Sequence, residues 1–361
     1  MCEACNPDDL TTAATRKTIP TVQAVGKVLA HDITEIRPGE FKGRAFRKGH
    51  VVRESDVEHL QRLGKENLFV IDLSDDEMHE DDAALALATA LAGSGVVLSG
   101  APEEGKINLV AGIDGLIRVN KDALRAFNML GEVACATLHD ATVVKKGQIV
   151  AGTRAIPLVV KRKLVKEAVR AAAGGVVSVA PMRRPRVGVV ITGNEVFHGQ
   201  IKDAFAPVIR EKVAGLNGEI AGLHYAPDDA AEITHRLREQ LDAGADLLIA
   251  TGGMSVDPDD VTRHAIRAAG ARDVTYGSPV LPGSMFLVGY IPAGNNGTSR
   301  EVPILGIPAC GMYAKTTIFD LVLPRILAGE RIGRSQLADL GHGGLCLKCP
   351  ECRYPVCPFG K

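Results

Sequence analysis

The sequence predicts an α/β protein whose two halves are built differently. Beyond residue 187, short apolar segments alternate with segments of helical spacing, a pattern typical of an open, mostly parallel sheet with helices on both faces. Before residue 180, β-like segments, turns and helices follow one another without that regular order, which favours mixed α+β structure. A length of 361 residues allows two or three domains.

Domain boundaries are indicated by changes in composition. The segment 181–186 contains two prolines and three arginines, which do not easily continue a helix or a sheet, so it predicts a linker. The predicted order is a polar arm with a Cys-x2-Cys pair (1–17), a mixed α+β accessory region with a split near 75–95 (18–180), the linker (181–186), the α/β domain (187–330), a second linker (331–345) and a cysteine-rich metal-binding tail (346–361).

Several elements are predicted in the accessory region. Ser55 and Glu58 have the spacing of a capping box, so we expect Ser55 to cap a helix that stops at Gly64. The Ala-rich segment 81–92 begins with acidic residues, which predicts a second helix. Further helices are expected over 121–130 and 161–173, and short strands over 67–71, 106–110, 142–144 and 148–152.

The α/β domain begins with a continuously apolar run, 187–191, as expected for a strand buried on both faces. A helix with Phe205 and Leu216 on its apolar side follows. Further strands are expected over 219–225, 246–250, 274–276, 285–291 and 302–307, and further helices through 233–241 and over 261–269 and 312–328, with a surface loop at 295–297.

Bulk composition excludes several classes of protein. The 42 basic and 43 acidic residues give a net charge of −1, and there is no Trp, so we expect no nucleic-acid partner. The sequence has no apolar run long enough to span a bilayer and no signal peptide, because its first residues are polar and acidic. We therefore expect a cytoplasmic protein without membrane contacts.

Glycines, small hydroxyl residues and carboxylates follow the predicted strands of the α/β domain. In open α/β sheets ligands bind outside the carboxyl ends of the strands, so these loops predict one site. Glycines let a backbone approach a ligand, and amides at a helix start favour anions. Nearby carboxylates then suggest a phosphate with a divalent cation, although single Asp residues are also common as helix caps. The residues are Thr192, Gly193, Asn194 and Glu195; Asp228; Gly252, Gly253, Ser255, Asp257 and Asp260; Pro282, Gly283 and Ser284; and Pro308.

These ordered motifs make residues 187–328 similar to the molybdopterin-binding domain of molybdenum-cofactor biosynthesis enzymes, and residues 20–180 faintly resemble the accessory domains of molybdopterin molybdotransferases. The resemblance implies that Gly252 and Gly253 cradle the terminal phosphate of molybdopterin, with Ser255 as a hydrogen-bond donor. It implies that Glu195, Asp228 and Asp260 are catalytic, and that Glu195 and Asp260 hold Mg²⁺ or orient substrate. Asp203, Asp257 and the remaining loop residues would contact the pterin.

Several positions depart from the family pattern. Ala204 and Phe205 follow Asp203 where the family has a hydroxyl residue and an amide, Asp257 replaces a usual glycine, and the Met-Asp-Gly-Tyr-Ala segment of molybdotransferases is missing. Three functions therefore remain open: an enzyme that helps load molybdate or tungstate onto molybdopterin or adenylylated molybdopterin, a non-catalytic carrier or sensor, and a nucleotide pyrophosphatase. A homodimer and a recipient molybdoenzyme are the protein partners that the resemblance implies.

Eight cysteines are distributed unevenly. Four form the pattern Cys346-x2-Cys349-x2-Cys352-x4-Cys357 and are followed by Pro358. This pattern is close to the bacterial ferredoxin run with its last gap longer by one, which favours a 4Fe–4S cluster, but Zn²⁺ and free redox thiols remain alternatives. Cys2 and Cys5 could add ligands or pair with each other. We expect Cys135 and Cys310 to be small buried side chains, although Cys310 borders the predicted site.

Overall fold

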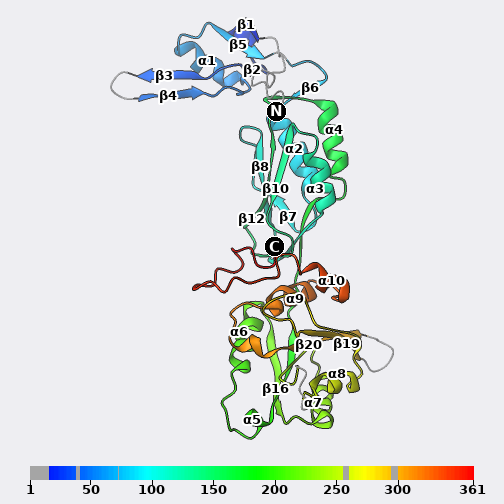
Figure 1. The fold of residues 1–361 in the computed structure, drawn as a ribbon. Coiled ribbons are helices and arrows are strands. Elements are labelled where there is room, and N and C mark those ends of the chain that lie inside the picture. Colours follow the sequence, from blue (N-terminus) through cyan, green and yellow to red (C-terminus); the bar gives the residue numbers. More distant parts are fainter. Residues whose placement is uncertain (1–15, 38–40, 72, 255–259, 294–299) are drawn as a thin grey trace, which may run out of the picture. The chain divides into compact units, whose positions relative to one another are not determined.

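The computed structural model describes residues 16–37, 41–71, 73–254, 260–293 and 300–361 (Figure 1). The chain divides into two compact units. The first contains the residues up to Leu138 together with Val144–Val179, and the second contains His139–Val143 and Ala180–Lys361. Residues 181–185 of the predicted linker form neither helix nor strand, whereas Arg186 already begins a strand. The two units are described separately below.

The first unit begins with a small sheet and a hairpin. Its elements are β1 (Arg16–Pro20), the 3-10 turn η2 (Thr21–Gln23), β2 (Val28–Leu29), β3 (Ile33–Arg37), β4 (Phe41–Phe46), α1 (Glu54–Arg62) and β5 (Asn67–Ile71). Strands β1, β5 and β2 pair in that order, and β3 pairs with β4. Helix α1 begins one residue before Ser55, with Arg53 at the N-cap and the Asp56 carboxylate accepting from the Arg53 amide at 2.8 Å. The predicted Ser55 cap is therefore wrong.

The rest of the first unit has its own core around α2. Its elements are β6 (Glu77–His79), α2 (Glu80–Leu91), β7 (Val96–Leu98), β8 (Lys106–Ala111), β9 (Gly115–Val119), α3 (Lys121–Asn128), β10 (Val133–Thr137), β11 (Val143–Val144), β12 (Ile149–Ala155), β13 (Val159–Lys161), α4 (Arg162–Ala171) and β14 (Val177–Ala180). The sheets are β10-β12-β8-β7, β11-β9-β14 and β13-β6. Phe127 and Leu87 are fully buried in this core, which is separate from the cluster around Leu60 and Val70.

The second unit contains a six-stranded sheet in the order β16-β15-β17-β20-β19-β18. Its elements are β15 (Arg186–Thr192), α5 (Asn194–Phe197), α6 (Phe205–Gly215), β16 (Glu219–Ala226), α7 (Ala230–Asp242), β17 (Leu247–Thr251), α8 (Thr262–Ala268), β18 (Arg272–Tyr276), β19 (Leu287–Ala293), β20 (Arg300–Ile307), the 3-10 turn η3 (Ala309–Met312), α9 (Ile318–Leu327) and α10 (Arg334–Asp339). Strands β15, β16, β17 and β20 are mutually parallel, and β19 is antiparallel to both of its neighbours. The predicted open, mostly parallel sheet is confirmed.

Helices cover both faces of this sheet (Figure 1). Helices α6 and α9 pack on one face with Val189 and Leu305, and α7 and α8 pack on the other with Val190 and Leu248. Strand β15 is buried from Val187 to Thr192, as its apolar run predicted. Helix α9 begins at Ile318 and not at residue 312. The predicted loop at 295–297 lies outside the described residues.

The cysteine tail is packed against the second unit. Phe359 is 3% exposed and belongs to the same core cluster as α6 and α9. At the start of the tail, the Cys346 amide donates to the Leu281 carbonyl at 2.8 Å, and the Leu281 amide donates to the Gly344 carbonyl at 2.8 Å. Across the described residues, no helix is both long and apolar enough to span a bilayer.

Candidate functional site

Strand register brings the predicted loops to one edge of the six-stranded sheet. Thr192, the last residue of β15, pairs with Ala226 at the end of β16, and Thr251 at the end of β17 pairs with Ile307 at the end of β20. Strand β19 runs the other way, so its first residue, Leu287, pairs with Gly306 at this same edge. We call this edge, with the loops that follow β15, β16, β17 and β20 and precede β19, the carboxyl edge.

Gly252 and Gly253 lie at the carboxyl edge in left-handed conformations, with φ of 81° and 54°. A Cβ atom on Gly252 would lie 2.3 Å from the Thr192 carbonyl oxygen, and one on Gly253 would lie 2.5 Å from Thr262 Oγ1. Packing between the loops therefore requires both glycines. The same close approach leaves the backbone of this turn without side chains, as binding of a phosphate would also need.

Thr192 joins these loops through its buried hydroxyl group. Its Oγ1 donates to the Thr251 carbonyl at 2.9 Å and lies 3.0 Å from Thr262 Oγ1. Thr192 is only 3% exposed. The hydroxyl group thus bonds to the residue that precedes the Gly252–Gly253 turn and does not face solvent.

Asn194 and Asp228 join the loops that follow β15 and β16. The Asn194 amide N–H donates to the Asp228 carboxylate at 3.0 Å, and the Asp228 amide N–H donates to the Asn194 side-chain oxygen at 3.1 Å. This reciprocal pair fixes the spacing of two loops of the predicted site. One carboxylate oxygen and the backbone amide of Asp228 are therefore used within the protein.

Glu195 and Asp260, the predicted magnesium residues, lie on neighbouring loops. Glu195 is exposed on α5, and its carboxylate turns back so that a Cβ atom on Gly193 would lie 3.0 Å from Oε1. Asp260 is half-buried two residues before α8. The predicted residues Ser255 and Asp257 lie outside the described residues. In the described part of the chain, no three His, Cys, Asp or Glu side chains are grouped closely enough to hold a metal ion.

Asp203 has a structural role at the start of α6. Its carboxylate accepts from the amides of Phe205 at 2.7 Å and Ala206 at 3.0 Å, and from the Tyr225 hydroxyl at 3.2 Å. Burial and the neighbouring Asp203 carboxylate together raise the pKa of Tyr225. Both oxygens of Asp203 are thus engaged by the protein itself.

The last two predicted loops lie beside a cavity that the sequence did not reveal. Gly283 is buried, and a Cβ atom on it would lie 2.5 Å from Ile318 Cγ2, whereas Ser284 is exposed and Pro308 is buried. Pro282 lines a cavity of about 710 Å³ together with the residues that follow η3 and with the tail. Five cysteines line it, namely Cys310, Cys346, Cys349, Cys352 and Cys357. We call it the thiol cavity.

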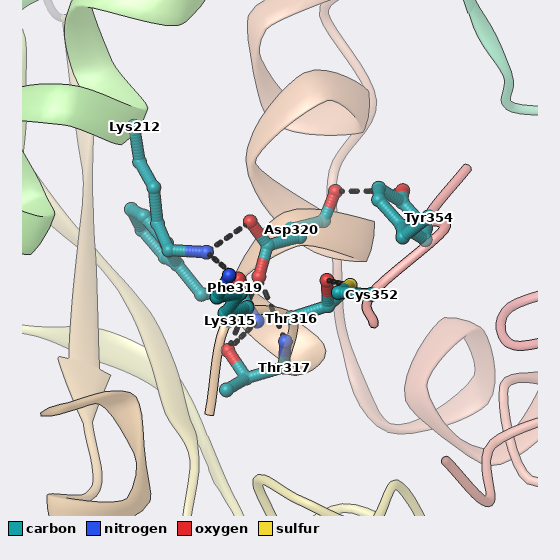
Figure 2. Close-up of polar contacts among 8 residues, drawn as sticks. All are labelled: Lys212, Lys315, Thr316, Thr317, Phe319, Asp320, Cys352 and Tyr354. Atoms are coloured by element: carbon teal, nitrogen blue, oxygen red, sulfur yellow. Dashed lines mark hydrogen bonds and ion pairs between the residues drawn. The ribbon is translucent and has the colours of Figure 1, made fainter. Parts of the chain in front are cut away.

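A group of polar contacts fixes the wall of the thiol cavity (Figure 2). Thr316 Oγ1 lies 3.2 Å from Cys352 Sγ. The pKa of Cys352 is lowered mainly by this hydrogen bond and then by a bond from the Tyr354 backbone. Burial raises the pKa of Tyr354, whose hydroxyl lies 3.4 Å from the Asp320 carbonyl. Asp320 is also bound by Lys212, so the tail, α9 and α6 are connected at this point.

The remaining cysteines differ in their surroundings. Cys135 is buried in the first unit, and burial raises the pKa of its thiol to about 12, which agrees with the predicted small buried side chain. Cys310 is half-buried, and burial also raises the pKa of its thiol, but its side chain lines the thiol cavity. Cys2 and Cys5 lie outside the described residues.

Comparison with protein families gives two separate matches. Residues 188–328 match the family described as "Probable molybdopterin binding domain". These residues belong to the molybdopterin-binding domain family. The match covers every loop of the carboxyl edge and ends before the cysteine tail. Residues 18–72 match a domain of unknown function (DUF8806), so the accessory region is not assigned a function by this comparison.

Matches to whole proteins cover only parts of the chain. A CinA-like protein of Mycobacterium avium (strain 104) is 32% identical over 95 residues, which are 26% of this chain and 22% of that protein. A CinA-like protein of Mycobacterium tuberculosis (strain ATCC 25618 / H37Rv) is 35% identical over 81 residues, which are 22% of this chain and 19% of that protein. The chain thus spans well under two thirds of these relatives.

Solved structures with a similar region include a tungsten cofactor synthesizing protein, MoaB, from Pyrococcus furiosus. It is 21% identical, with a TM-score of 0.32, and the match covers 42% of this chain and 99% of that one. A molybdenum cofactor biosynthesis protein from the same organism is 14% identical, with a TM-score of 0.25, and the match covers 90% of this chain and 66% of that one.

Proposed function

We propose that the carboxyl edge binds molybdopterin or its adenylylated form, and that the protein assists the loading of molybdate or tungstate. One observation carries this proposal: four parallel strands of a molybdopterin-binding domain end at the same edge, and their loops hold the residues that the sequence singled out. The Gly252–Gly253 turn would take the terminal phosphate, and Asn194 and Asp228 would form the neighbouring wall.

Binding is tested by isothermal titration of the full chain with molybdopterin. We expect micromolar or tighter binding by the wild type and at least a tenfold loss for Asp260→Ala, because Asp260 lies on the same connection between β17 and α8 as the Gly252–Gly253 turn. Asp242→Ala is the matched control, since this exposed carboxylate ends α7 and therefore lies toward the opposite edge of the sheet. Absence of wild-type binding, or equal losses for both variants, would contradict the proposal.

At this edge Mg²⁺ would need phosphate oxygens of the ligand as well as protein carboxylates. Mg²⁺ prefers oxygen ligands and is commonly held by one or two carboxylates plus substrate phosphates, and the described residues form no group of three metal-binding side chains. Glu195 and Asp260 would therefore hold the ion together with phosphate oxygens, where it would neutralise phosphate charge. For the wild type, the molybdopterin affinity measured with Mg²⁺ should then differ from the affinity measured with a chelator. This difference should be smaller for Glu195→Gln.

A non-catalytic carrier is the second candidate, and the position of Asp203 favours it. Both Asp203 oxygens accept from the backbone at the start of α6, so this carboxylate is poorly available for catalysis. Turnover of molybdopterin with molybdate in a reconstituted assay separates the candidates. Binding without molybdate-dependent product would identify a carrier or sensor.

The remaining alternatives are tested on the same samples. Hydrolysis of ADP-ribose or of a nucleotide sugar would reveal the nucleotide pyrophosphatase. Light scattering after size-exclusion chromatography tests the homodimer, and transfer of loaded cofactor to an apo-molybdoenzyme tests the recipient partner.

A further inference from the structure

The five thiols of the thiol cavity come from two separate parts of the chain. Cys310 belongs to η3, directly after β20, and the other four belong to the tail. The tail is held on both sides of these cysteines, by the backbone pair between Leu281 and Cys346 and by the buried side chain of Phe359. The tail thiols are therefore presented to one cavity by the folded domain.

The arrangement of the thiols does not suit a single metal ion. A structural Zn²⁺ needs four donors within about 2.3 Å of one point. In the described residues no three His, Cys, Asp or Glu side chains converge in this way. The thiols instead surround a cavity of about 710 Å³, which has room for a group much larger than one ion. Iron–sulfur clusters are held by several Cys thiolates, and such a group is larger than a single ion.

Cysteine spacing supports the same interpretation. Cys346, Cys349 and Cys352 repeat the Cys-x2-Cys-x2-Cys start of the bacterial ferredoxin run. In two-cluster ferredoxins the fourth cysteine of that run serves the other cluster, so the fourth ligand of one cluster comes from elsewhere in the chain. Cys357 and Cys310 are the two further thiols that line the cavity.

The charge of the cavity wall also fits a cluster. A cluster bound by thiolates is anionic, and an anion is stabilised by nearby cations. Lys315, Lys348 and Arg353 all line the cavity. Neither Asp nor Glu is among the residues that line it.

We propose that the thiol cavity houses a 4Fe–4S cluster held by Cys346, Cys349 and Cys352, with the fourth thiol from Cys357 or Cys310. Because Pro282 and Cys310 line the same cavity, the cluster lies against two loops of the carboxyl edge. The tail is thereby a redox module built onto the ligand-binding domain. This inference does not depend on which ligand the carboxyl edge takes.

The test is anaerobic reconstitution of the full chain with iron(II), sulfide and a thiol reductant. We expect about four iron and four sulfide per wild-type chain, with brown visible absorbance and a paramagnetic signal after reduction. Cys349→Ala, at an exposed position, should lower the iron content at least twofold. Cys135→Ala is the matched control and should keep the wild-type content, because Cys135 is buried in the first unit. Of Cys310→Ala and Cys357→Ala, the variant that loses the four-iron form identifies the fourth ligand.

Several outcomes would overturn the inference. A wild-type chain that binds no iron, or a Cys349→Ala variant with unchanged iron content, removes the cluster from this cavity. One equivalent of Zn²⁺ that iron and sulfide cannot displace would make the cavity a zinc site instead. Titration of the same samples with molybdopterin keeps the two proposals separate. If no cluster forms but molybdopterin still binds, only the cluster proposal is contradicted.

Discussion

Gly252 illustrates how one residue serves both the fold and the proposed chemistry. Its φ of 81° is in the left-handed region, and a side chain there would collide with the Thr192 carbonyl. Gly244 has almost the same φ, 88°, but nothing lies within 4 Å of the position of its Cβ atom. Alanine variants at Gly244 and Gly252 therefore separate the cost of backbone strain from the cost of steric contact.

We predict that Gly244→Ala lowers the free energy of unfolding by about 1 kcal/mol. Gly252→Ala should cost roughly 2 kcal/mol more, because the loop must also move away from Thr192. Urea unfolding of both variants measures the difference. Equal costs would show that the turn at Gly252 can adjust without penalty, and the packing argument would then be wrong.

Glu80 is a buried carboxyl group with a strongly raised pKa. It is 8% exposed, and a Cβ atom on Gly105 would lie 2.9 Å from its Oε2. Burial, followed by the nearby Asp81 carboxylate, raises the pKa of Glu80 to about 7, against opposing effects of Arg154 and Lys48. The folded chain therefore retains a proton that the unfolded chain releases near its ordinary pKa of 4.5.

This difference makes stability depend on pH. The contribution of Glu80 favours folding fully below pH 4.5, decreases as the pH rises toward 7, and is lost above that value, a change on the order of 3 kcal/mol. Glu80→Gln keeps a neutral side chain of similar shape, so we expect it to be more stable than wild type at pH 8 but not at pH 4.5. Urea midpoints at both pH values measure this, and parallel pH profiles would contradict it.

At the level of elements, the N-cap at Thr317 determines where α9 begins. The apolar pattern predicted a helix from residue 312, but Thr317 Oγ1 accepts from the Phe319 amide at 3.2 Å, and the Asp320 carboxylate accepts from the Thr317 amide at 2.7 Å. This capping box sets the first helical residue at Ile318. The preceding residues are left to form η3 and the wall of the thiol cavity.

We predict that Thr317→Ala lowers the free energy of unfolding by about 1 kcal/mol, because the buried Phe319 amide loses its acceptor. Thr317→Ser keeps the hydroxyl group and should recover most of this loss. Thermal unfolding of the two variants beside wild type distinguishes the lost cap from a lost methyl contact. A serine variant as unstable as the alanine variant would point to the methyl group.

At the level of the whole molecule, the tail is an integral part of the second unit. Phe359 is buried with Leu321 and Leu323 of α9. Tyr354 packs edge-on against it, with ring centroids 6.3 Å apart. These contacts anchor the tail in the core of the second unit.

We predict that Phe359→Ala destabilises the second unit by roughly 3 kcal/mol, because a buried ring is replaced by a cavity. Val356→Ala is the control and should change stability little, since Val356 is 85% exposed. Hydrogen exchange resolved by peptide measures both effects, and α9 should lose protection only in the Phe359 variant. Unchanged protection in both would mean that the tail is not part of the core.

The sequence alone determined the alternation of strands and helices in the second unit, because an apolar run such as 187–191 is a local pattern that indicates a buried strand. The same patterning located the loops of the carboxyl edge, since parallel strands must end together. It could not show that the Asp203 carboxylate accepts from the first amides of α6, because such a carboxylate and a ligand-binding carboxylate look alike in sequence.

Only the tertiary structure decided where the cysteine tail lies. The contacts between Leu281 and Cys346, between Thr316 and Cys352, and around Phe359 join residues far apart in the chain, and no local periodicity encodes such pairs. The four tail cysteines could be read as metal ligands from their spacing, but that they meet Cys310 at one cavity follows from packing, which depends on the whole fold.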